Sequence, residues 1–179
     1  MIHESYYWKQ LLLESTEEFR RFKDLPDIDE ETHVKIEKAI FIGFYSIRKL
    51  LETETKLTDS LKSGLHKVSW FQCVGTEVTW RNNHKLDELY NLNRPHSESR
   101  DLWFIASRII HSFIFNIYVN EGGGFDGAFF TSDSDKNKKL YSLTTDEIID
   151  IFQLVGNNNV TELEWYRCPE TGRGITRAT

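Results

Sequence analysis

The feature that most constrains the fold is the apolar run DLWFIASRIIHSFIFNIYV at residues 101–119. Apolar side chains fill most of its positions, so it must lie in the interior of a folded protein. Arg108 and His111 interrupt it, together with polar Ser and Asn residues, which favours a buried helix over a membrane span. We predict a helix over about 98–120 that ends at the following EGGG segment, because glycine readily adopts the left-handed conformation at helix ends.

The predicted helix has two different non-polar faces when its residues are placed at 100° intervals. One is an ordinary core stripe, formed by Leu102, Ala106, Ile109, Ile110, Phe113 and Ile117. The other combines cations with aromatic rings and consists of Arg100, Phe104, Arg108, His111 and Phe115. A solvated helix face would carry Glu, Lys or Gln. We therefore expect the second face to contact another part of the chain, a second copy of the chain or a ligand.

Two further long helices are predicted before this one. Residues 5–25 carry apolar side chains at helical spacing, and residues 31–53 are apolar around most of the circumference. The middle of the chain is less regular. Residues 67–80 favour a short hairpin across Gly75, and residues 84–92 favour a short helix or turn.

The periodicity changes after the EGGG segment. Residues 125–132 and 138–143 predict two strands, residues 144–156 predict an amphipathic helix, and a second hairpin follows across the PETG turn. The fold class predicted is α+β: a mainly α-helical bundle, about 1–120, followed by a small ββαββ unit, about 125–179. No Pro/Gly/Ser-rich linker divides the two parts, so we expect a single domain over 1–179.

Composition narrows the function classes. The net charge is -6 and the pI is near 5.5, which argues against constitutive binding to a nucleic-acid backbone, although a local basic patch stays open. Two cysteines, Cys73 and Cys168, are too few for a disulfide framework, and the N-terminus has no signal pattern. These features predict a cytoplasmic protein with no membrane partner. No metal-ligand spacing or phosphate-loop order is present, so we predict no metal site and no cofactor.

Arg108 and His111 are the one chemical lead in the apolar run. Imidazole can transfer protons near neutral pH, and guanidinium binds phosphate through two parallel donors. Three residues apart on a helix, they lie on one face. Together they could support metal-independent RNA cleavage, with His111 as the acid or base and Arg108 stabilising the transition state.

A helical core whose long penultimate helix carries Arg and His resembles the HEPN superfamily. That superfamily includes bacterial toxin and defence ribonucleases that act as dimers, and non-catalytic members. The resemblance implies an RNA-directed homodimer with Arg108 and His111 as catalytic residues beside Arg100, Phe104 and Phe115. Two residues separate this Arg–His pair, where the family motif has four to six.

The alternative is a non-enzymatic interaction or regulatory protein. In that interpretation the second face of the 98–120 helix docks a partner protein or a second copy of the chain, with Phe104 and Phe115 as contact residues. A third feature is the basic KNKK segment at 136–139 near Tyr141, which could bind single strands or form a solvated hairpin tip.

Overall fold

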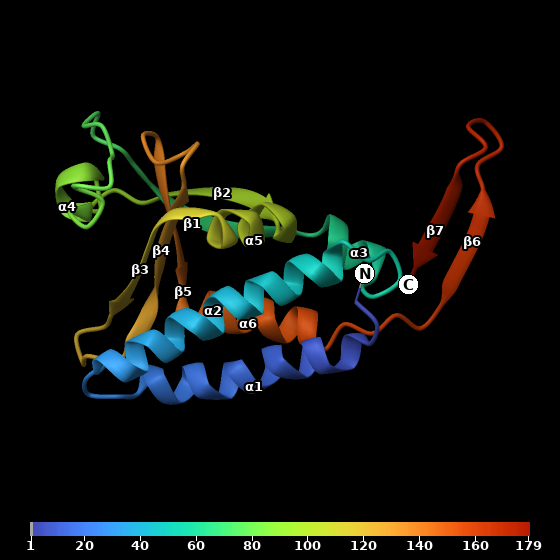
Figure 1. Ribbon diagram of the computed structural model, residues 1–179, viewed down its shortest axis with the longest axis horizontal. Coiled ribbons are helices and arrows are strands. Elements are labelled where there is room, and N and C mark those ends of the chain that lie inside the picture. The colour runs from blue at the N-terminus through green and yellow to red at the C-terminus, as the bar shows by residue number, and fades with distance from the viewer. Residues whose placement is uncertain (1) are drawn as a thin grey trace.

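The structure is a computed structural model that describes residues 2–179, and it has the α+β fold that the sequence predicts (Figure 1). The described residues contain six helices: α1 (Ser5–Lys23), α2 (Glu30–Leu51), α3 (Asp59–Ser63), α4 (Leu86–Leu89), α5 (Leu102–Ile110) and α6 (Thr145–Gly156). The main sheet is antiparallel throughout, with the strand order β2-β1-β5-β4-β3. Its strands are β1 (Leu65–Gln72), β2 (His96–Asp101), β3 (Ser112–Val119), β4 (Phe125–Ser132) and β5 (Lys139–Thr144). A separate two-stranded sheet pairs β6 (Leu163–Arg167) with β7 (Gly174–Ala178).

Helices α1, α2 and α6 lie within two residues of their predicted boundaries. Side chains cap the first turn of each of these helices. Asp29 accepts a hydrogen bond from the Thr32 N–H at 2.7 Å, and Thr144 forms a capping box with Glu147. Such caps satisfy backbone donors that the first turn leaves free.

The helix predicted over 98–120 is wrong. Strand β2 occupies its start, α5 spans only nine residues, and β3 begins directly after His111. Asp101 caps α5 by accepting a hydrogen bond from the Phe104 N–H at 2.7 Å. The helical portion of the chain is therefore shorter than predicted, and a five-stranded sheet takes the place of the bundle's third long helix.

The reason lies in the composition of residues 112–119. A spacing of four residues fits one turn of a helix, but it also fits two steps along one face of a strand. The segment SFIFNIYV is rich in aromatic and β-branched residues, which favour a pleated strand over a helix. Pairing with β4 then supplies the backbone hydrogen bonds of this segment.

The predicted hairpin across Gly75 is also wrong, because β1 is one strand that pairs with both β2 and β5. The segment after it, residues 73–95, forms a long connection that contains α4, the short helix predicted there. The ββαββ element order is confirmed for the C-terminal part. Its strands do not form one unit, since β4 and β5 lie in the main sheet and β6–β7 stand apart (Figure 1).

One face of the main sheet packs against α1, α2, α5 and α6 in a continuous buried cluster that runs from Ile2 to Val155. The opposite face is covered in part by residues 73–95, where Tyr90, Val78 and Leu89 form a smaller cluster. The sheet is thus the middle layer between a helical layer and a long connection. None of the helices in residues 2–179 has both the length and the apolar character needed to cross a bilayer.

Helix α2 approaches α6 closely at Gly43. The ring of Phe152 lies where a Cβ atom would stand on Gly43, and it also packs edge-on against Phe44 at 5.3 Å between centroids. Phe19 of α1 contacts the same ring at 5.8 Å. The absence of a side chain at Gly43 therefore sets how deeply α6 packs on the other two helices.

We predict that Gly43→Ala destabilises the protein by about 1–3 kcal/mol, because the added methyl group overpacks the core at Phe152. The direction of the change in the free energy of unfolding is diagnostic, since Gly→Ala inside a helix otherwise stabilises a protein by about 1 kcal/mol. Urea unfolding checks it, with Phe152→Leu as the matched background. The cost of Gly43→Ala should fall when Phe152 is smaller, and a stabilised Gly43→Ala protein would contradict the packing argument.

Candidate functional site

The structure distributes the five predicted site residues over three elements. Arg100 lies on β2, Phe104 and Arg108 lie on α5, His111 is the residue that ends α5, and Phe115 lies on β3. They do not form one helix face as predicted. Arg100, Phe104 and Arg108 nevertheless come together, because β2 leads directly into α5.

Two guanidinium groups contact the Phe104 ring. The Cζ atoms of Arg100 and Arg108 lie 4.4 Å and 4.5 Å from its centroid. A carboxylate holds each arginine: the Nε of Arg100 donates to Glu98 at 2.7 Å, and the Nε of Arg108 donates to Asp135 in the β4–β5 turn. Both bonds use Nε, so the paired Nη atoms that bind phosphate bidentately are left for another acceptor.

The sheet beneath α5 carries a row of rings that crosses all five strands in register. From β2 to β3 the row contains His96, Trp70, Tyr141, Phe130 and Phe115. Adjacent members touch at the first end, where His96 stacks on Trp70 at 4.4 Å and 18°. Phe104 of α5 meets the middle of the row, with its ring edge-on to Tyr141 at 5.5 Å. The arginines thus sit at the edge of an aromatic surface.

Lys139 and Glu98 connect the two ends of this group. The Nζ of Lys139 lies 4.2 Å from the Trp70 ring centroid and forms an ion pair with Glu98. Glu98 therefore binds Lys139 and Arg100 together. We call the nine residues the arginine–aromatic cluster: Trp70, His96, Glu98, Arg100, Phe104, Arg108, Asp135, Lys139 and Tyr141.

The electrostatics of the cluster follow from its partial burial. Burial acts to raise the pKa of Glu98, but the hydrogen bonds from Lys139 and Arg100 outweigh it, and the pKa of Glu98 falls below its ordinary value. Burial, and then the charges of Glu98 and Asp135, raise the pKa of Tyr141 to about 12. The cluster consequently holds three cations, two carboxylates and a neutral phenol at physiological pH.

His111 and Phe115 lie outside the cluster. His111 is exposed, and its backbone N–H donates to the Ser107 carbonyl at 3.1 Å. Its side chain makes no hydrogen bond to any of residues 2–179. Phe115 packs against Phe41 of α2 at 4.6 Å, which places it in the core. Phe115 therefore contacts another part of the chain, as one of the expectations for the second face allows, whereas His111 contacts none through a side-chain hydrogen bond within residues 2–179.

The sequence pattern does not identify several members of the cluster. Periodicity does not single out Trp70, Glu98 or Asp135, and His96 falls in a segment that reads as a polar loop. The HSESRD segment does carry a signal, because its charged and aromatic residues alternate with Ser, as they do along a half-buried strand. Within the described residues, no group of three or more His, Cys, Asp and Glu side chains could hold a metal ion.

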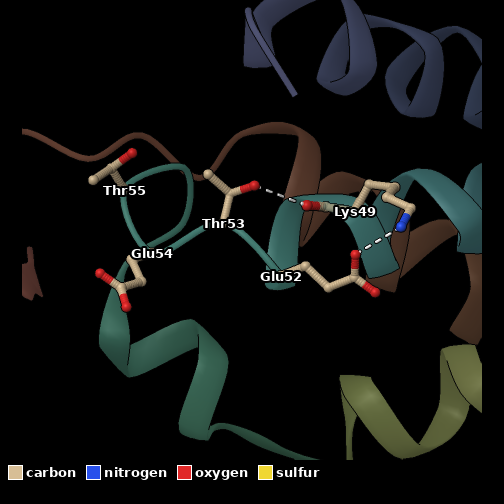
Figure 2. Close-up of a pocket in the computed structure, with 5 residues that line it drawn as sticks. All are labelled: Lys49, Glu52, Thr53, Glu54 and Thr55. Atoms are coloured by element: carbon tan, nitrogen blue, oxygen red, sulfur yellow. Dashed lines mark hydrogen bonds and ion pairs between the residues drawn. The ribbon is translucent and has the colours of Figure 1, made fainter. Parts of the chain in front are cut away.

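A cavity lies elsewhere, at the C-terminal end of α2. It measures about 600 Å³ and is lined by Lys49, Glu52, Thr53, Glu54 and Thr55 (Figure 2). The Lys49 ammonium pairs with Glu52 at 2.7 Å, and the Thr53 hydroxyl donates to the Lys49 carbonyl at 3.2 Å. Lys49 and Glu52 thus satisfy each other within a single segment, which leaves this cavity a weaker candidate than the cluster.

Comparison with known proteins adds no assignment. The chain matches no protein-family model, and no curated protein or solved structure is found to be similar to it.

We predict that Tyr141 makes the fold sensitive to alkali. The phenol of the unfolded chain ionises near its ordinary pKa of 10.0, whereas the pKa in the folded protein is about 12, so folding favours the neutral form. The stability this contributes is present below pH 10 and is lost as the pH rises from about 10 to about 12. Urea unfolding of Tyr141→Phe should show a smaller loss across that window than the wild type.

The matched control is Tyr6→Phe, which removes a phenol that is 61% exposed. That variant should lose as much stability in alkali as the wild type. Equal pH dependence in all three proteins would contradict the burial of the Tyr141 hydroxyl in the cluster.

Proposed function

We propose that this protein binds single-stranded RNA at the arginine–aromatic cluster. The observation that carries the proposal is the pair of guanidinium groups on Phe104, beside the stacked rings of Trp70 and His96. Single strands are bound by cations that follow the phosphates and by rings on which unpaired bases stack. The cluster supplies both within a few residues.

The charge distribution supports the same conclusion despite the acidic total. Residues 79–112 and 133–139 carry eight Lys and Arg against six Asp and Glu, whereas the rest of the chain carries 14 against 22. The β4–β5 turn and the acidic α1–α2 turn lie at opposite ends of β4, at the top and the bottom left of Figure 1. A polyanion would therefore be drawn to the end that holds the cluster.

Helix α5 adds an exposed ring next to the half-buried rings of the cluster. Trp103 is 43% exposed, and the Cζ of Arg48 lies 3.3 Å from its ring centroid. Arg48 also donates to the Ser107 hydroxyl. A further base could stack on Trp103 next to a positively charged group.

We retain RNA as the proposed ligand, but we do not propose that the protein cleaves it. The HEPN resemblance rests on a long helix that carries Arg108 and His111, and α5 ends before His111. Arg108 is paired with Asp135, and no hydrogen bond within residues 2–179 orients the His111 imidazole. The alternative of docking through the second face of a 98–120 helix loses its surface for the same reason, since Arg100 and Phe115 lie on strands.

We expect Arg100→Gln to weaken binding of a fluorescent single-stranded RNA roughly tenfold, a loss of about 1.4 kcal/mol. It should also reduce the slope of log K against log salt by about 0.7, the value for one phosphate contact on a single strand. Fluorescence anisotropy over a range of salt concentrations measures both. Glu98 keeps its partner Lys139 in this variant, so no carboxylate is left unpaired.

Arg21→Gln is the matched control, because Arg21 is an exposed arginine on α1, outside the cluster. It should bind RNA as the wild type does. Trp103→Ala should also lose about 1–3 kcal/mol of binding, as the removal of one stacking ring does. The absence of binding at low salt, or equal losses in Arg100→Gln and Arg21→Gln, would refute the proposal.

We further expect the bound RNA to stay intact. Incubation of a labelled RNA with the protein, with and without chelator, should leave its length unchanged on a denaturing gel. His111→Ala should then bind and behave like the wild type. Cleavage that persists in chelator and disappears in His111→Ala would instead assign His111 a catalytic role.

A further inference from the structure

The C-terminal hairpin stands away from the body of the protein. Strands β6 and β7 pair only with each other, and in Figure 1 this hairpin arm, residues 163–178, extends to the right of all helices. Two contacts hold its base: the Thr176 hydroxyl donates to Glu54 at 2.8 Å, and the Ala178 N–H donates to Asp59 at 3.1 Å. No other sheet or helix covers this arm within residues 2–179. An isolated two-stranded hairpin is only marginally stable in water, so a contact with a further surface would stabilise the arm.

The β6 half of one face of the arm is apolar near its base and basic toward its tip, whereas the β7 half of that face contacts the body of the protein at Thr176. Leu163, Trp165 and Arg167 point to the same side of β6, because alternate residues of a strand share a face. Leu163 is 55% exposed and Trp165 is 65% exposed. The indole packs over Gly174, where a Cβ atom would lie only 3.0 Å from its Nε1. The Trp165 indole is therefore held in one orientation by Gly174 and remains exposed.

A second uncovered apolar surface lies on the helical layer. A groove of about 250 Å³ between α1 and α2 is lined by Tyr7, Trp8, Leu11, Ile42 and Ser46. Tyr7 is 73% exposed and Ile42 is 49% exposed. Aromatic and aliphatic side chains in this arrangement are typical of a contact site that a partner covers.

The groove and the arm are of similar length, and their apolar and charged side chains follow in the same order. Along α1, the exposed stripe passes from Tyr7 and Leu11 to Glu14 and Glu18, and at 1.5 Å per residue it spans about 16 Å. Each strand of the arm spans about 14 Å from its first to its last residue, four steps of about 3.4 Å. An arm laid along this stripe places its apolar half on the apolar half of the stripe.

The charges complete the match. Arg167 then faces the acidic end of the stripe, where Glu14 and Glu18 lie. The neighbouring cation Lys35 of α2 is already paired with Glu31 at 2.7 Å. Opposite charges at the rim favour this register and disfavour the reversed one.

We infer that the protein forms a two-fold dimer in which the arm of each copy lies in the α1–α2 groove of the other. The arm of one copy cannot fill its own groove, because its contacts with Glu54 and Asp59 direct it away from the helices (Figure 1). In a two-fold dimer the arm of each copy covers the groove of the other, so both arms and both grooves are buried, as in other isologous interfaces. This inference does not depend on RNA binding, since none of its residues belongs to the arginine–aromatic cluster.

Sedimentation equilibrium of the full chain tests the inference. The wild type should be a dimer, and both Trp165→Glu and Ile42→Glu should raise the dimer dissociation constant by at least about tenfold, the equivalent of losing roughly 1.4 kcal/mol. Trp80→Glu is the matched control, because it makes the same change at a tryptophan that is 73% exposed outside both surfaces. Circular dichroism confirms that each variant is folded.

Two combinations separate arm exchange from other dimers. A mixture of Trp165→Glu and Ile42→Glu should form a heterodimer, since an intact arm then meets an intact groove once. Arg167→Glu and Glu18→Arg should each weaken the dimer, and the two together in one chain should restore it. These four side chains are exposed in one copy, so folding does not depend on them.

A monomeric wild type overturns the inference, and so does a dimer that Trp165→Glu leaves intact. Equal weakening by Trp80→Glu would show non-specific association and overturn it as well. Loss of RNA binding in Arg100→Gln with an unchanged dimer would support both proposals separately. If the wild type does not bind RNA but the arm variants still dissociate the dimer, the proposed function is refuted and the dimer inference is supported.

Discussion

The antiparallel register of β1 with both of its neighbours is the constraint on which the rest of the structure depends. It aligns His96, Trp70 and Tyr141 in one row across three strands, and β4 continues that row with Phe130. A shift of β1 by one residue would turn Trp70 to the opposite face of the sheet and interrupt the row. The register therefore decides both what the helical layer packs on and which side chains meet α5.

The helices that the sequence predicts well are those whose pattern allows one interpretation. Helices α1, α2 and α6 combine helical spacing with capping residues, and each has its predicted position. Residues 98–120 allow two interpretations, because a spacing of four residues fits both one face of a helix and one side of a strand. The pairing of β3 with β4, the next strand along the chain, resolves that ambiguity, and the periodicity of residues 98–120 contains no information about this partner.

The candidate site is predictable to the same degree. The spacing of Arg100, Phe104 and Arg108 predicts them as a group, since they are separated by four residues and remain neighbours across the junction of β2 and α5. Asp135 of the β4–β5 turn and Lys139 of β5 become adjacent to the group only when the sheet forms. The same spacing wrongly adds His111, because it assumes a helix that does not continue to that residue.

The two carboxylates of the cluster explain how it can be ordered and still attract a polyanion. Glu98 and Asp135 each fix a guanidinium through Nε, which removes much of the conformational freedom that a free arginine would lose on binding. Because Lys139 shares Glu98 with Arg100, three cations meet two carboxylates and one positive charge stays uncompensated. An equal number of carboxylates would order the arginines as well but would cancel that attraction. The sharing of Glu98 is therefore the feature on which the proposed binding of phosphate depends.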